Sequence, residues 1–181
     1  GLKKTDIDLW MTIGRETIMG TDPILPFIST IDFIGLTAIC VTRTGRVIVL
    51  VSGGDAEAVR RTNLYDEVVV YKPTFDHGLE ALLTELQPKK IALNFSPDDK
   101  AADGLSYGLY LRFEKVLKNT GIQAEICSSA PIVRTIRGRK TEWEKEKVRQ
   151  AALTADQIFK DAISFIKEGV TEIDIYNFFF E

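Results

Sequence analysis

Histidine and cysteine are scarce in this sequence, and their scarcity excludes several kinds of site. The chain has one histidine, His77, and two cysteines, Cys40 and Cys127. A single histidine excludes a zinc site or a catalytic mechanism that needs a histidine pair within this chain. The cysteines lie in predicted apolar strands, which favours buried, reduced thiols over a disulfide framework. His77 lies at a predicted helix start, where we interpret it as a surface residue.

The sequence also lacks an excess of basic charge and a long hydrophobic run. Acidic residues outnumber basic ones by 26 to 23, so no overall positive field is available to hold nucleic acid or an anionic membrane. No apolar run approaches the ~20 residues of a membrane-spanning helix, and residues 1–4 lead into a strand rather than a signal-peptide core. These absences predict a globular, cytoplasmic protein that binds neither nucleic acid nor membrane.

Strand and helix patterns alternate through most of the chain and predict an α/β fold. Apolar strands are expected at residues 7–13, 36–42 and 46–52, with a short glycine-containing turn joining the last two as a hairpin. Helices then alternate with strands: helices at 55–64, 75–87 and 105–119, strands at 67–71, 90–95 and 123–127. Right-handed crossovers would place helices on both faces of one mixed sheet, which is a three-layer α/β/α domain.

The loops could hold a phosphate-binding site or the carboxylates of a two-metal nuclease, and the sequence favours neither. Residues 52–55 (Ser-Gly-Gly-Asp) join a strand to a helix, as phosphate-binding loops do. They lack the spacing of those loops, however, and we interpret Asp55 as a helix N-cap. A two-metal nuclease needs converging carboxylates. Asp6 precedes the first strand whereas Asp22 lies in a proline-containing loop, so we expect no such cluster.

Trp10 and Arg15 are the candidate site residues. An aromatic side chain on an apolar strand, followed by an arginine at the strand end, can present a stacking surface and a fork for a carboxylate. The alternatives are that Trp10 belongs to the core and that Arg15 forms an ion pair with Glu16 or Asp22.

Two helix starts are predicted in the last forty residues. Thr141 and Glu144 fit a capping box, and apolar residues then recur at helical spacing until Gly169, which we expect to end the helix. Residues 171–174 (Thr-Glu-Ile-Asp) repeat the start signal.

A domain boundary is expected near residue 132, where Pro131 can open a short linking helix. We therefore divide the chain into domains 1–132 and 133–181. The last predicted helix is apolar on more than one side, which predicts a homodimer or a larger assembly. The alternative is that the two final helices pack back on their own chain. The apolar residues concerned are Ile173, Ile175, Phe178, Phe179 and Phe180.

Several segments resemble the creatinase/prolidase family. Residues 8–16 (Asp-Leu-Trp-Met-Thr-Ile-Gly-Arg-Glu), with 22–23, 90–96 and 105–108, resemble its N-terminal domain. The segments 136–144, 148–152 and 168–172 are more strongly similar to the connector and opening helices of the "pita-bread" catalytic domain of Xaa-Pro peptidases. The resemblance implies a ribonuclease-H-like α/β/α domain and a C-terminal helical segment, truncated just inside the catalytic domain.

The resemblance also implies a function for a longer parent protein. The family's peptidases use a pair of manganese, cobalt or zinc ions, held by two Asp, one His and two Glu, to cleave the bond before proline. None of these ligands can be placed in this sequence, so we expect no cofactor in this chain. The N-terminal domain would contribute to a homodimer and to substrate access, with Trp10 stacking on the proline ring and Arg15 binding the free carboxylate of a dipeptide.

Two other functions remain compatible with the resemblance. Family members that have lost their metal ligands act as non-catalytic peptide- or protein-binding modules. Creatinase-type amidinohydrolases share the same two-domain architecture.

Overall fold

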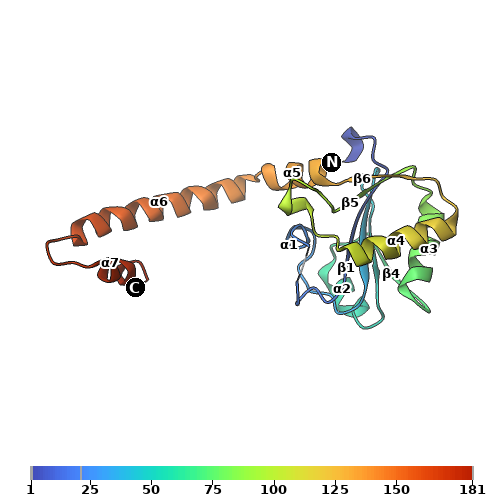
Figure 1. Ribbon diagram of the computed structural model, residues 1–181, viewed down its shortest axis with the longest axis horizontal. Helices are drawn as coiled ribbons and strands as arrows, with labels where there is room; N and C mark the ends of the chain where they lie inside the picture. Colours follow the sequence, from blue (N-terminus) through green and yellow to red (C-terminus); the bar gives the residue numbers. More distant parts are fainter. Residues whose placement is uncertain (1, 21, 181) are drawn as a thin grey trace. The chain divides into compact units, whose positions relative to one another are not determined.

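Six strands form one mixed sheet in the order β4-β3-β2-β1-β5-β6 (Figure 1). Strand β2 is antiparallel to both of its neighbours, and the other neighbouring pairs are parallel. The carboxyl ends of five strands therefore lie along one edge of the sheet. The strands are β1 (Leu9–Gly14), β2 (Thr37–Thr42), β3 (Val47–Val51), β4 (Glu67–Val70), β5 (Lys90–Leu93) and β6 (Glu125–Ser128).

The computed structural model describes residues 2–20 and 22–180, which form two compact units, Gly1–Ile136 and Arg137–Glu181. The first unit holds the sheet, and the second holds the last two helices. The sequence-based boundary after residue 132 falls inside α5. The helices are α1 (Leu25–Ile28), α2 (Ala56–Thr62), α3 (Phe75–Leu86), α4 (Tyr107–Thr120), α5 (Ala130–Gly138), α6 (Glu142–Phe165) and α7 (Glu172–Phe178), with 3₁₀ turns η1 (Leu2–Lys4) and η2 (Lys100–Ala102).

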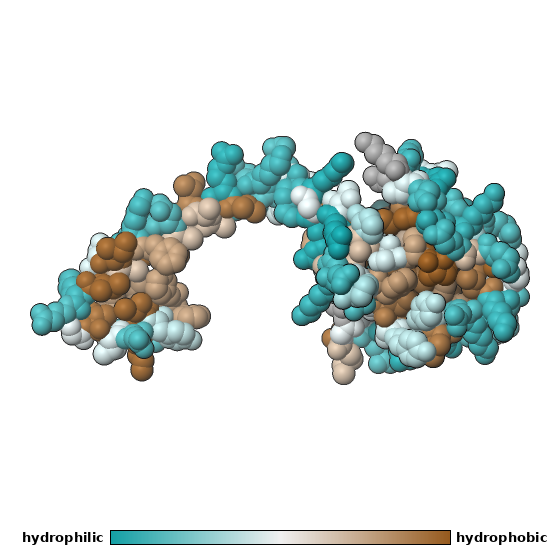
Figure 2. All heavy atoms as spheres, turned by 45° about the horizontal axis from the view of Figure 1, so that its top comes forward, coloured by the Kyte–Doolittle hydropathy of each residue, from teal (hydrophilic) through white to brown (hydrophobic). Residues whose placement is uncertain are grey.

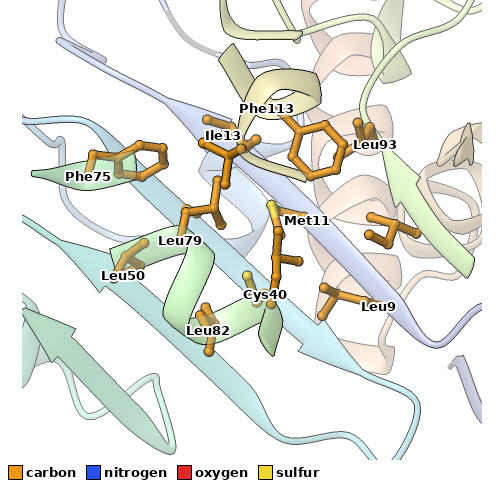
Figure 3. Close-up of a cluster of buried hydrophobic side chains, with 14 of the residues drawn as sticks. Leu9, Met11, Ile13, Cys40, Leu50, Phe75, Leu79, Leu82, Leu93 and Phe113 are labelled. Atoms are coloured by element: carbon orange, nitrogen blue, oxygen red, sulfur yellow. The ribbon is translucent and has the colours of Figure 1, made fainter. Parts of the chain in front are cut away.

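Helices cover both faces of the sheet, which confirms the predicted three-layer α/β/α fold. On one face, Leu9 and Met11 of β1 pack with Leu79 of α3 and Phe113 of α4 in the largest core cluster (Figure 3). The opposite face carries two smaller clusters, one around Trp10 and α5 and one around α2. Side chains alternate between the faces of a strand, so the apolar run of β1 supplies both cores.

Asp55 does not cap α2 as predicted. It occupies the N-cap position, but its backbone is already helical (φ -87°, ψ -20°) and its side chain makes no capping bond. Its carboxylate instead accepts the backbone N–H groups of Ile34 and Gly35 and the hydroxyl of Ser52. Asp55 therefore ties the loop before β2 to the end of β3.

The predicted surface position of His77 is confirmed, and of the two cysteines predicted to be buried only Cys40 is. His77 is exposed, and its Nδ1 lies 2.7 Å from Oγ1 of Thr74, the N-cap residue of α3. Cys40 and Cys127 are free thiols, buried and half-buried respectively. Within residues 2–20 and 22–180, no helix is both long and apolar enough to cross a membrane.

Both C-terminal helices begin with the predicted capping boxes, at Thr141 and Thr171. The end predicted for α6 is wrong, because the helix stops at Phe165, four residues before Gly169. Ile166 caps it with an extended backbone, and Gly169 adopts φ +90° in the turn that follows. This turn reverses the chain, so that α7 can pack against the end of α6.

The two helices of the second unit contact each other through phenylalanine rings. Phe165 stacks on Phe178 at 4.9 Å between ring centroids, and Phe159 meets Phe179 edge to face at 5.8 Å. Phe178, one of the apolar residues from which an assembly is predicted, is half-buried by this contact. Apolar side chains still gather on the surface around α7 (Figure 2), where Phe180 remains 75% exposed.

Candidate functional site

A cavity of about 380 Å³ lies where β1 ends, beside the loop that leads to α1. Its walls combine the end of β1, this loop, the start of α1 and the start of α4. In open α/β sheets, ligands bind outside the carboxyl ends of the strands, and this cavity lies at that edge of the sheet. The lining residues that matter below are Thr12, Arg15, Asp22, Leu25, Gly104 and Leu109.

Asn94, the residue after β5, organises the buried side of this cavity. Its Oδ1 accepts the indole N–H of Trp10 at 2.8 Å and the hydroxyl of Ser129 at 2.6 Å. Its Nδ2 donates to Oγ1 of Thr12 at 3.0 Å and to Oδ2 of Asp22 at 2.7 Å. These four bonds use the full capacity of a side-chain amide. We call Trp10, Thr12, Asp22, Asn94 and Ser129 the Asn94 network.

Asp22 is the charged member of the Asn94 network, and only 7% of its surface is exposed. Its Oδ1 accepts the backbone N–H of Ile24 at 3.1 Å, and its Oδ2 accepts the amide of Asn94. Burial raises the pKa of Asp22 above its usual value, and these two bonds offset part of the rise. The carboxylate is thus held in place at a cost in desolvation.

Gly104 lets the chain close over Asp22. A Cβ atom at this position would lie 2.2 Å from Cγ of Asp22, a distance that no side chain tolerates. The backbone N–H groups of Gly104 and Leu105 both donate to the carbonyl oxygen of Asn94, which fixes the loop before α4 to the end of β5. Packing and hydrogen bonds therefore define the position of the carboxylate from several sides.

The two residues singled out from the sequence lie in different environments. Trp10 is 3% exposed and belongs to the core between the sheet and α5, as the alternative interpretation held. Its ring lines a separate apolar cavity of about 260 Å³, together with Val41 and residues of α5. Arg15 is exposed and lines the 380 Å³ cavity. The Asn94 network connects Trp10 with this cavity through Asp22.

Arg15 does not form the ion pair with Glu16 or Asp22 that was its alternative interpretation. Within the described part of the chain, its guanidinium is in no ion pair. A guanidinium is a strong, bidentate partner for a carboxylate. Its charge is therefore available at the cavity.

The residues present do not fit the metal pair that the family resemblance implies. Among residues 2–20 and 22–180, no three His, Cys, Asp or Glu side chains come together in a way that could hold a metal ion. Asp22 accepts hydrogen bonds from the backbone N–H of Ile24 and from the side-chain amide of Asn94. A hydrolytic metal centre is thus not built from these residues.

Comparisons with known proteins support the fold assignment. No protein-family model and no curated protein matches the sequence. Among solved structures, the chain is similar to a Xaa-Pro dipeptidase from Bacillus anthracis, with a TM-score of 0.60 and 20% identity over 95% of this chain and 42% of that one. An X-Pro aminopeptidase from Thermotoga maritima gives a TM-score of 0.59 and 21% identity, over 95% of this chain and 45% of the enzyme.

The chain shares its fold with Xaa-Pro peptidases. A proline dipeptidase from Streptococcus pneumoniae also matches, with a TM-score of 0.52 and 20% identity over 77% of this chain and 93% of that one. The chain spans less than half the length of the Bacillus anthracis and Thermotoga maritima enzymes.

Proposed function

We propose that this chain is the N-terminal part of a metal-dependent Xaa-Pro dipeptidase or aminopeptidase that acts in the cytoplasm. The observation that carries the proposal is the match over 95% of the chain to a Xaa-Pro dipeptidase and an X-Pro aminopeptidase, each more than twice as long as the matched region. The catalytic metal pair would be held by residues outside this chain, because the described residues offer no fitting set.

In this proposal the chain contributes to a homodimer and to substrate access rather than to the hydrolytic step. Arg15 would bind the free carboxylate of a dipeptide, which a planar guanidinium can grip with two hydrogen bonds. Trp10 would act indirectly, because its buried ring supports Asn94 and thereby the cavity that Arg15 borders. Ile18 and Met19 lie in the loop after β1 that also carries Arg15, and these exposed apolar residues offer surface for a second subunit.

The test uses the longer protein, with Ala-Pro as the substrate and manganese restored after chelation. We expect hydrolysis that depends on the metal, and an Arg15→Ala variant with KM raised about ten- to hundredfold and kcat little changed, because uniform binding is lost. An Ala-Pro substrate with an amidated carboxyl group should respond much less to the substitution. Arg61→Ala, which removes an exposed guanidinium of α2, is the matched control.

Other outcomes would contradict the proposal. Peptide or protein binding without hydrolysis would indicate a non-catalytic module, and hydrolysis of creatine in place of dipeptides would indicate an amidinohydrolase. Equal effects of Arg15→Ala on free and amidated substrates would remove Arg15 from carboxylate recognition. Sedimentation at micromolar concentration tests the assembly, and a clean monomer would exclude the homodimer.

A further inference from the structure

The apolar cavity of about 260 Å³ between the sheet and α5 shares no lining residue with the cavity beside Asp22. Its floor is formed by Trp10 of β1 and Val41 of β2, which are partners in the β1–β2 register and therefore stand side by side on one face of the sheet. The other walls come from η1 and from the side of α5 that carries Ile132 and Ile136. All of these residues belong to the first unit, which ends at Ile136.

The lining offers a ligand almost no polar contact. Among the described residues that form it, none is charged. The hydroxyl groups of Thr5 and Thr135 already donate to backbone carbonyl oxygens of their own turns, each at 2.8 Å. The N–H of Trp10 is likewise engaged, because it donates to Asn94. A charged ligand would lose its hydration here without compensation, so the cavity suits a neutral molecule.

We propose that this cavity binds a neutral aromatic molecule of one or two rings, such as indole. An apolar cavity of about 150 Å³ is enough to take up benzene in another protein, and the larger volume found here leaves room for a second ring. The Trp10 side chain provides an aromatic wall on which a ligand ring can stack or pack edge to face. The site is separate from the proposed peptidase activity and does not depend on it.

The walls of the cavity are fixed before a ligand arrives. Trp10 is 3% exposed and is held by its 2.8 Å bond to Oδ1 of Asn94. Ala130 and Val133, on the buried side of α5, pack in the same core cluster as Trp10 and hold the helix beside the cavity. A ligand would therefore lose little affinity to the ordering of side chains.

The experiment is an NMR titration of the 181-residue chain with indole, followed through the side-chain N–H signals of its two tryptophans. Trp143 is the internal control, since it lies exposed on α6 in the second unit. We expect the Trp10 signal to shift saturably with a Kd below about 1 mM, and the Trp143 signal to stay in place.

Two results of this titration would overturn the proposal. One is the absence of a saturable shift of the Trp10 signal up to about 10 mM indole. The other is a set of shifts confined to Trp143 and to the amides of α7, which would place indole on the exposed apolar residues of the second unit.

A pair of related ligands tests whether the site requires a neutral molecule. Methylindole and indoleacetate share the ring system of indole, and only indoleacetate carries a carboxylate. We expect methylindole to bind about as tightly as indole, and indoleacetate to bind at least about tenfold more weakly. Equal affinities for the two ligands would contradict a cavity without charged partners.

A substitution that fills the cavity locates the ligand. Val41→Phe places a ring beside Trp10 and should weaken indole binding at least about tenfold. Val68→Phe is the matched control, because it makes the same change at a half-buried position of the edge strand β4 and should leave the affinity unchanged. Undiminished binding to a folded Val41→Phe variant would refute the location. If that variant does not fold, the Trp10 and Trp143 signals of the wild type decide the question.

The same titration on the longer protein separates a small molecule from a protein segment as the occupant. The proposal predicts the same affinity for indole in both proteins. Binding to the 181-residue chain alone would mean that a segment of the longer protein fills the cavity, and the proposal would then be wrong. Because the titration uses no metal and no peptide, its result is distinguishable from that of the peptidase assay.

Discussion

Replacing Asn94 by alanine tests whether the Asn94 network holds the first unit together. The substitution removes all four side-chain hydrogen bonds of the amide. Trp10 and Asp22 cannot easily find new partners, because both are buried and otherwise fixed. Ser129 and Thr12 carry hydroxyl groups that can rotate toward other acceptors.

The expected loss of stability follows from the hydrogen bonds that Trp10 and Asp22 lose with the amide. A buried polar group that loses its partner costs about 1–3 kcal/mol, and more when it is charged. For the Trp10 N–H and the Asp22 carboxylate together, we expect Asn94→Ala to lower the free energy of unfolding by about 4 kcal/mol. This is a large part of the roughly 5–15 kcal/mol that a typical domain has.

The assay is urea unfolding followed by the fluorescence of Trp10. Because the chain has two compact units, the background variant Trp143→Phe removes the other tryptophan, which lies exposed on α6. The signal then reports the first unit alone. Asn119→Ala is the control, since its amide donates to Glu80 on the surface, and it should change stability by less than about 0.5 kcal/mol.

A loss below about 1 kcal/mol for Asn94→Ala would refute this reasoning. It would mean that water fills the vacated space and replaces the amide as the partner of Trp10 and Asp22. Asn94→Asp separates geometry from charge. It keeps the acceptor for Trp10 but places a second carboxylate against Asp22, so it should destabilise most at neutral pH and recover part of the loss on acidification.

Two further predictions concern the surroundings of Asp22. Gly104→Ala should lower the free energy of unfolding by about 2 kcal/mol or more in urea titrations, because its Cβ would clash with the Asp22 carboxylate. Gly108→Ala, in α4 with open space around it, should raise that free energy by up to about 1 kcal/mol, and equal effects would contradict the argument. Burial raises the folded-state pKa of Asp22, and the nearby Asp103 adds to the rise. The contribution of Asp22 to stability is therefore complete below its unfolded-state pKa of 3.8, and it is lost as pH rises through the folded-state pKa. The stability of the wild type relative to Asp22→Asn should therefore increase from pH 7 to pH 4, and a flat difference would show that the pKa is not raised.

The fold was largely predictable because its signals are local. Each of the predicted strands and helices of the first unit is found, with ends that shift by a few residues. The capping boxes at Thr141 and Thr171 were also predictable, since a cap needs only residues three positions apart. The roles predicted for Asp55 and Gly169 were wrong, because a local pattern does not show which of several local roles a residue takes. The Asp55 side chain binds the backbone of a distant loop instead of capping α2, and α6 ends at Phe165, before it reaches Gly169.

The site was much less predictable, because its residues meet only through the topology. Asn94 lies 72 residues from Asp22 and 84 from Trp10 in the chain. One signal was nevertheless present in the sequence. Asn94 and Ser129 each directly follow a short strand, and the carboxyl ends of parallel strands meet at one edge of a sheet. Polar residues at these two positions indicate a shared polar cluster once the strand order is known.

The position of Asn94 explains why an apolar core residue and a charged cavity residue depend on each other. Trp10 belongs to the core beneath α5, and Asp22 lines the cavity, yet both bind the same amide. Within the described residues, no buried side-chain nitrogen or oxygen lacks a hydrogen-bond partner. A fully satisfied network of this kind fixes a single arrangement, whereas a partly satisfied one is costly. The core therefore holds the cavity carboxylate in its position, and substitutions at Trp10 should disturb the Asp22 side of the cavity through Asn94.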